Sequence, residues 1–214
     1  MKAIILTKSA MKAHGVSGVC TTAYDLDSNK ILRLVSNEDG GPIPFPYNQR
    51  YECLDMIDAQ IIKQCPIGPQ QENVLINLNS IKNVCQPEIP ITTLYSLYKS
   101  RMAGETLYMD DTISRLDSVE IYKHSLEILR VKNLEVANNE WNTTKARFTA
   151  ADDFWKQYKY FSVKDPDYMI EKGSSEIKRI GDAYIVVSIP YDPYFDKSGA
   201  NKGYYKFIAA IYPA

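Results

Sequence analysis

The sequence has little histidine and no closely spaced cysteine pair. It contains two histidines and four cysteines, and no two of the cysteines form a C-x-x-C motif. Structural zinc sites use cysteine pairs at that spacing, often with histidines nearby. The sequence therefore argues against a zinc site. Most of the cysteines adjoin apolar runs, which favours buried reduced thiols in a cytoplasmic protein, with a disulfide as the alternative.

Long apolar runs and an excess of one charge are also missing. The apolar start, Ala3 to Leu6, is shorter than the roughly 7–15 residues of a signal-peptide core, and no later run reaches the roughly 18 residues of a membrane span. The chain carries 25 Lys+Arg against 26 Asp+Glu. Without a global positive field, any site for nucleic acid must be a local patch. We expect a soluble, cytoplasmic protein that does not contact a membrane.

The residue combinations of common enzymes are not found. Gly40-Gly41 is followed by prolines and not by a helix start, so there is no phosphate loop or dinucleotide fingerprint. Cys20 and His14 are residue types that can serve as nucleophile and base. Nothing in the sequence indicates that the base is positioned next to the thiol, so a thiol of Cys20 packed in the core is favoured. Asp110-Asp111 and Asp152-Asp153 are adjacent pairs, which point to opposite faces of a strand. We expect no metal, no cofactor and no catalysis.

Strand patterns dominate what is present. Two of them flank the turn residues Asp27-Ser28-Asn29 and predict a hairpin. In its second strand, Ile31, Arg33 and Val35 share one face, and Leu32 and Leu34 share the other. A polar loop is expected over 8–17 and a Gly/Pro-rich loop over 37–49. The expected strands of the first half are 3–7, 19–26, 30–36, 53–62 and 73–78.

Helical spacing interrupts this pattern once. Residues 90–102 carry apolar side chains at helical intervals, with Thr92 or Thr93 as the expected cap and Gly104 at the end. We expect the segment 89–117 to connect two domains, 1–88 and 118–214. The expected strands of the second half are 119–123, 126–136, 141–149, 158–163, 183–189 and 204–212. Two groups of about five strands predict a mainly β protein of two small barrels with one clear helix.

A series of short motifs runs along most of the chain: Ile4 to Gly18, Gly18-Val-Cys20, Ile31 to Val35, Leu54-Asp55, Gln70 to Asn73, Lys145 to Phe148, Tyr160 to Tyr168, Ser188, and Tyr205 to Ile211. In this order they resemble the motifs of the dual OB-containing domain family of bacterial proteins. One residue departs from the pattern, since Leu34 follows Arg33 where the family tends to have proline. The resemblance implies two tandem OB-like five-stranded barrels and brings no established activity. Binding of nucleic acid or nucleotides is implied by analogy with other OB folds.

An OB fold commonly binds its ligand on the face of strands 2 and 3 and on the loops between strands 1–2 and 4–5. Basic residues in such places can meet phosphates, and aromatic residues beside them can stack on bases. Gln71 and Asn73 either fix their loop or read a base edge. The candidate ligand-binding residues are Lys8, Lys12, His14, Arg33, Gln71, Asn73, Lys145, Arg147 and Tyr160.

Two functional interpretations follow, and neither decides the role of the two strand arginines. Arg33 and Arg147 bind a ligand or are structural, paired with an acid such as Asp55 or Asp165. The first interpretation is a non-catalytic module that binds single-stranded DNA, single-stranded RNA or a nucleotide. The alternative is a protein-interaction or regulatory subunit that uses its tyrosine-rich strands, since the chain has 16 tyrosines.

Overall fold

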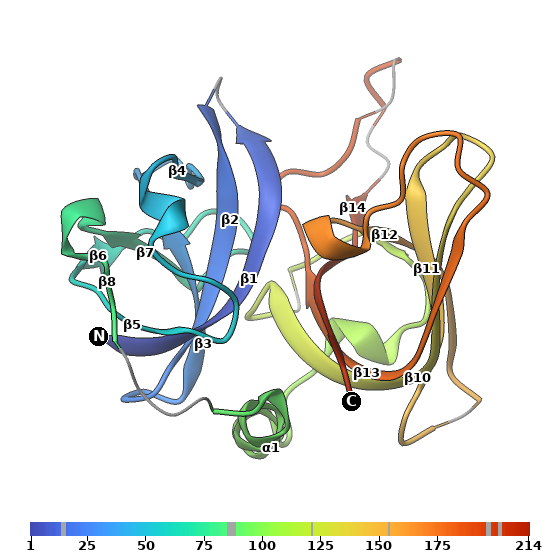
Figure 1. The fold of residues 1–214 in the computed structure, drawn as a ribbon, viewed down its shortest axis with the longest axis horizontal. Helices are drawn as coiled ribbons and strands as arrows, with labels where there is room; N and C mark the ends of the chain where they lie inside the picture. The colour runs from blue at the N-terminus through green and yellow to red at the C-terminus, as the bar shows by residue number, and fades with distance from the viewer. Residues whose placement is uncertain (14–15, 85–88, 121, 154, 196–197, 201–202) are drawn as a thin grey trace. The chain divides into compact units, whose positions relative to one another are not determined.

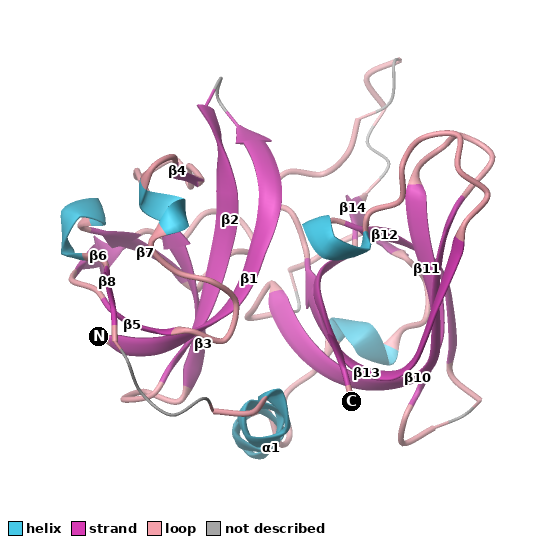
Figure 2. Ribbon diagram, in the orientation of Figure 1, coloured by secondary structure: helices cyan, strands magenta, loops and turns pink. Residues whose placement is uncertain are grey.

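The chain is mainly β, and it divides into two compact units, Met1–Gly104 and Glu105–Ala214. The computed structural model describes residues 1–13, 16–84, 89–120, 122–153, 155–195, 198–200 and 203–214, with the backbone alone for 10–13 and 16–17. The described part has one α-helix, α1 (Ile91–Arg101), which belongs to the first unit (Figures 1 and 2). The boundary between the units falls inside the segment 89–117.

The first unit is built on one sheet, ordered β6-β7-β3-β2-β1-β5-β8, with β4 pairing to β2. Most neighbours are antiparallel, but β3 and β7 are parallel. Its strands are β1 (Lys2–Ala13), β2 (Val16–Asp25), β3 (Lys30–Val35), β4 (Ile43–Pro44), β5 (Met56–Asp58), β6 (Ile61–Gln64), β7 (Asn73–Ile76) and β8 (Lys82–Asn83).

The second unit contains a closed barrel, ordered β10-β11-β12-β15-β13. Here β12 and β15 are the parallel pair. A separate two-stranded sheet joins β9 and β14. The strands are β9 (Arg115–Leu116), β10 (Leu126–Asn138), β11 (Thr144–Ala150), β12 (Gln157–Val163), β13 (Ile177–Ser188), β14 (Tyr204–Tyr205) and β15 (Phe207–Pro213).

The two units share one strand order. In the second unit, β10, β11, β12, β13 and β15 are the first to fifth strands of the barrel. Around the ring they follow the order first, second, third, fifth, fourth, and the fourth (β13) pairs with the first (β10). In the first unit, β5 and β6 are two parts of the fourth strand, and β7 and β8 are two parts of the fifth. Because β5 pairs with both β1 and β8, and β6 pairs with β7, the same order results. The expected pair of OB-like domains is thereby confirmed, with a closed five-stranded barrel in the second unit and a half-barrel sheet in the first.

Alternating apolar residues fill the interior of each barrel. In β3, Leu32 and Leu34 join the core of the first unit, whereas Arg33 points to the other side of the sheet, as the alternation predicts. In β11, Ala146 and Phe148 join the core of the second unit, where Phe148 stacks on Tyr158 at 4.7 Å between ring centroids. This alternation leaves the outward positions of β11 and β12 for polar and aromatic side chains.

Several expectations about local structure are wrong. Residues 8–13 continue β1 and pair with β2, so the loop expected over 8–17 is mostly strand. The segment 119–123 has no strand in its described residues. Helix α1 begins after Pro90, which has extended backbone and no side-chain cap bond, so neither threonine is its cap. Pro90 marks the start of the helix instead, because its ring fixes the φ angle of the residue just before the first helical turn.

Candidate nucleic-acid interface

The outer face of β11 and β12 presents a cluster of basic side chains. Lys145 and Arg147 alternate with the core residues Ala146 and Phe148, so they project outward. Lys145 lies opposite Ser162 of β12 and donates a hydrogen bond from Nζ to its Oγ at 2.7 Å. Partial burial, followed by the charge of Lys164, lowers the pKa of Lys145. Both basic side chains therefore lie where the second and third strands of the barrel meet.

A β-bulge in β12 adds an aromatic ring to this face. Ala146 pairs with Phe161 and Phe148 pairs with Tyr158, so two residues, Lys159 and Tyr160, lie opposite Arg147. Tyr160 has φ 64°, in the left-handed region that is unfavourable for residues with a bulky side chain. Its side chain is 70% exposed. Bulges re-aim side chains in this way beside functional sites.

Arg147 is held by an acidic residue of the neighbouring strand. Glu135 lies opposite Arg147 in the β10–β11 ladder and accepts hydrogen bonds from its Nε, at 2.8 Å, and from its Nη2. On its other side Glu135 faces Arg179 of β13, whose Nε lies 3.6 Å from Oε1. Both arginine side chains are mostly exposed. Asp165, the partner expected from the sequence, instead caps a turn and accepts a bond from the backbone N–H of Ile211.

Two loops beside these strands carry exposed tryptophans. Trp155 lies between β11 and β12 and is 80% exposed, and Trp141 lies between β10 and β11 and is 75% exposed. Tyr158, by contrast, is buried, and its hydroxyl donates to the Met109 carbonyl at 2.7 Å. Burial therefore separates the aromatic residues of this region into core rings and solvent-exposed rings.

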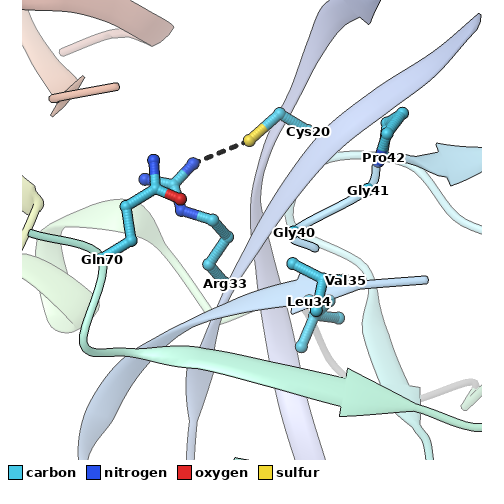
Figure 3. Close-up of a pocket in the computed structure, with 8 residues that line it drawn as sticks. All are labelled: Cys20, Arg33, Leu34, Val35, Gly40, Gly41, Pro42 and Gln70. Atoms are coloured by element: carbon cyan, nitrogen blue, oxygen red, sulfur yellow. Dashed lines mark hydrogen bonds between the residues drawn. The ribbon is translucent and has the colours of Figure 1, made fainter. Parts of the chain in front are cut away.

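Arg33, the corresponding arginine of the first unit, is buried. Its side chain is on β3, and the residue is 3% exposed. Nη1 donates a hydrogen bond to Cys20 Sγ at 2.8 Å, and Nη2 lies 3.8 Å from Glu72, which replaces Asp55 as its acidic partner. Arg33, Cys20 and Gln70 line a cavity of about 20 Å³ with the 40–42 loop (Figure 3). That volume holds one water-sized group and no base.

The other candidates of the first unit also have internal contacts. Lys8 is on strand β1 and donates from Nζ to the Tyr51 carbonyl at 2.6 Å and to Glu52 at 2.7 Å. Gln71 donates to the Gly68 carbonyl at 2.6 Å, which fixes its own loop. Asn73 is fully buried beside Gln70. The side chain of Lys12 and all of His14 lie outside the described residues.

The second unit also buries two ionisable side chains around the segment 108–111. Glu127 accepts hydrogen bonds from the backbone N–H groups of Tyr108 and Met109, and burial raises its pKa. Lys206 donates from Nζ to the carbonyls of Tyr108 and Asp111, and burial lowers its pKa to about 8. All of these contacts hold the segment to the barrel. Across the described residues, no group of three His, Cys, Asp or Glu side chains is arranged to hold a metal ion.

The model of the dual OB-containing domain family matches residues 1–211, nearly the whole chain. The chain belongs to this family. The match agrees with the shared strand order of the two units. No curated protein matches the sequence of this family member. In the described residues, no helix is long and apolar enough to span a membrane.

Sequence reasoning found part of the basic face and missed the rest. Lys145, Arg147 and Tyr160 come together on one surface of this dual OB domain. Lys159 was not selected, because strict alternation puts neighbours such as Lys159 and Tyr160 on opposite faces. Arg179 was also missed. The pairing of Glu135 with both arginines depends on the ladder register, which the sequence alone does not display.

Proposed function

We propose that this protein is a non-catalytic module that binds single-stranded nucleic acid or a nucleotide on the outer face of β11 and β12. The observation that carries the proposal is Tyr160, an exposed aromatic residue at a bulge, flanked in the ladder by Arg147 and Lys159. Sequence-independent binding of single strands combines rings on which bases stack with basic side chains that follow the backbone.

The position of this face in the barrel supports the same proposal. OB folds bind oligonucleotides across their second and third strands, and β11 and β12 are those strands here. Such analogy gives the place of a site and leaves its chemistry to the side chains. In this face the chemistry is one exposed ring together with Lys145, Arg147 and Lys159. An unpaired nucleotide offers the complementary groups, a base with a π-surface and a phosphate.

The experiment that tests this proposal is fluorescence anisotropy with labelled single-stranded DNA and RNA of about ten nucleotides. If about three cations contact phosphates, the logarithm of the binding constant falls with the logarithm of salt concentration with a slope of about −2. Lys145→Ala and Arg147→Ala should each reduce this slope. Lys172→Ala, which removes an exposed lysine from a loop of the same unit, is the matched control. Absence of binding at micromolar protein and low salt would overturn the proposal.

One observation favours a second candidate function, an interaction with another protein. The segment between β13 and β14 exposes Tyr194 and Phe195, and the Tyr194 ring packs edge-on against Tyr205 of β14 at 5.7 Å between ring centroids. Exposed aromatic rings are enriched in protein interfaces. If single strands do not bind, this tyrosine-rich region is the next surface to examine.

A further inference from the structure

Glu135 is the one acidic side chain among the outward positions that form a row across the face. Lys159 and Tyr160 of β12 lie opposite Arg147 of β11, Arg147 lies opposite Glu135 of β10, and Glu135 lies opposite Arg179 of β13. The row therefore crosses four strands. Within it, one carboxylate lies between two guanidinium groups.

The carboxylate of Glu135 divides its oxygens between the two arginines. Oε2 accepts from Arg147 Nε at 2.8 Å, and Oε1 lies 3.6 Å from Arg179 Nε. A phosphate group also presents two outward oxygens, and arginine binds phosphate and carboxylate with the same planar fork of donors. A phosphate on the outer face therefore offers these two arginines the same kind of acceptor as this carboxylate.

The exchange is energetically feasible because both arginines are exposed. Their side chains are 67% and 74% exposed, against 24% for Glu135. Exposed ion pairs contribute only about 0–1 kcal/mol, so little is lost when such a pair opens. Arg33 gives the contrast within this chain, because its buried ion pair with Glu72 would leave an uncompensated charge if it opened.

We infer that Glu135 is an internal substitute for phosphate, and that a phosphate of the bound nucleic acid or nucleotide displaces it to bridge Arg147 and Arg179. This inference rests on the proposed function and adds two features to it. Arg179 becomes part of the binding face, and the ligand backbone crosses the strands from Tyr160 towards β13. Because its carboxylate competes with the phosphate for the two arginines, Glu135 lowers the affinity for the phosphate-bearing ligand.

The test compares Glu135→Gln with the wild-type protein in the anisotropy assay, using the same single-stranded probe. The amide keeps the shape of the side chain and removes its charge, so the ligand no longer competes with a carboxylate. We expect the dissociation constant to fall by about two- to fivefold, the range of a weak surface ion pair. Arg179→Ala should raise the dissociation constant by a similar factor.

Glu140→Gln is the matched control, because Glu140 is an exposed acidic residue in the loop that follows β10. It should change the affinity by less than about twofold, since a distant exposed charge is screened by salt. If Glu135→Gln binds no more tightly than the wild type while Tyr160→Ala still weakens binding, the inference is wrong and the proposed function stands. If neither the wild type nor Glu135→Gln binds the probe, both are wrong.

Discussion

Tyr158 and Tyr160 are two positions apart on β12, but they lie on opposite sides of the barrel wall. Tyr158 is buried and stacked on Phe148, whereas Tyr160 is exposed to solvent. In a regular strand, residues two apart share a face. The bulge opposite Arg147 and the left-handed backbone at Tyr160 reverse this relationship. The exposed ring of the proposed site is thus a product of irregular backbone.

Replacing Tyr160 should separate binding from stability. Tyr160→Ala removes the ring and should weaken binding of single strands about tenfold or more, because one base–aromatic stack contributes roughly 1–3 kcal/mol. Tyr160→Gly should bind as weakly but fold more stably than Tyr160→Ala by about 1 kcal/mol, since glycine adopts the left-handed region without strain. Anisotropy and denaturant unfolding measure the two effects.

Phe45→Ala, which removes an exposed ring of the first unit, is the control for the tyrosine variants. It should leave the affinity unchanged. Wild-type affinity in Tyr160→Ala would show that the ring does not stack on a base.

Arg33 and Arg147 should respond differently to substitution by alanine. Arg33→Ala leaves the largely buried Glu72 without its cation and should destabilise the protein by about 3–5 kcal/mol. Arg147→Ala breaks an exposed pair and should cost about 1 kcal/mol or less, while it weakens binding. Unfolding in denaturant measures the first effect and anisotropy the second. Equal destabilisation by the two variants would contradict this assignment of roles.

Lys206 should make stability depend on pH above neutrality. Burial lowers its pKa from the usual 10.5 to about 8, so between these values the unfolded chain binds a proton that the folded protein has lost. The free energy of unfolding then rises with pH across this window. The neutral amine keeps two N–H groups for the carbonyls of Tyr108 and Asp111.

Lys206→Met provides the reference for this prediction, because methionine has a similar length and no titrating group. Between pH 7.5 and 10, wild-type stability should rise relative to that of the variant. Parallel curves for the two proteins would mean that Lys206 titrates at its ordinary pKa.

Gly203 should tolerate alanine less well than Gly173, although the backbone of each has a positive φ, 81° and 82°. A Cβ at Gly203 would collide with the carbonyl oxygen of Leu116, where β14 pairs with β9, whereas a Cβ at Gly173 meets open space. Gly173→Ala should therefore cost only the backbone strain, about 1 kcal/mol, and Gly203→Ala more. Thermal unfolding of the two variants compares these costs directly, and equal melting temperatures would contradict the prediction.

The sequence predicts the fold well because most of the fold depends on periodic patterns. The hairpin around Asp27–Asn29, the helix near 91–101 and the strand alternation of β3 and β11 all follow from spacing alone. The length of β1 was missed because its polar residues beyond Thr7 resemble a loop, and only pairing with β2 makes them a strand.

The candidate site was less predictable, because it depends on pairing between distant strands. The neighbours of the two arginines differ, since apolar side chains share the face of Arg33 and polar ones share that of Arg147. Their acidic partners, Glu72 and Glu135, come from other strands or loops and follow only from the pairing. The position of Tyr160 depends on a bulge, and bulges carry no firm signal in a single sequence. The charge relationship of Glu135 and Arg179 joins residues of β10 and β13 through register.

The most direct test of the binding face is an NMR titration of ¹⁵N-labelled protein with single-stranded DNA or RNA of about eight nucleotides. We predict that the largest changes in amide chemical shift occur in β11 and β12, around Arg147, Lys159 and Tyr160, with smaller changes near Arg179. Saturable shifts confined to the first unit, or no shifts at all, would contradict the account.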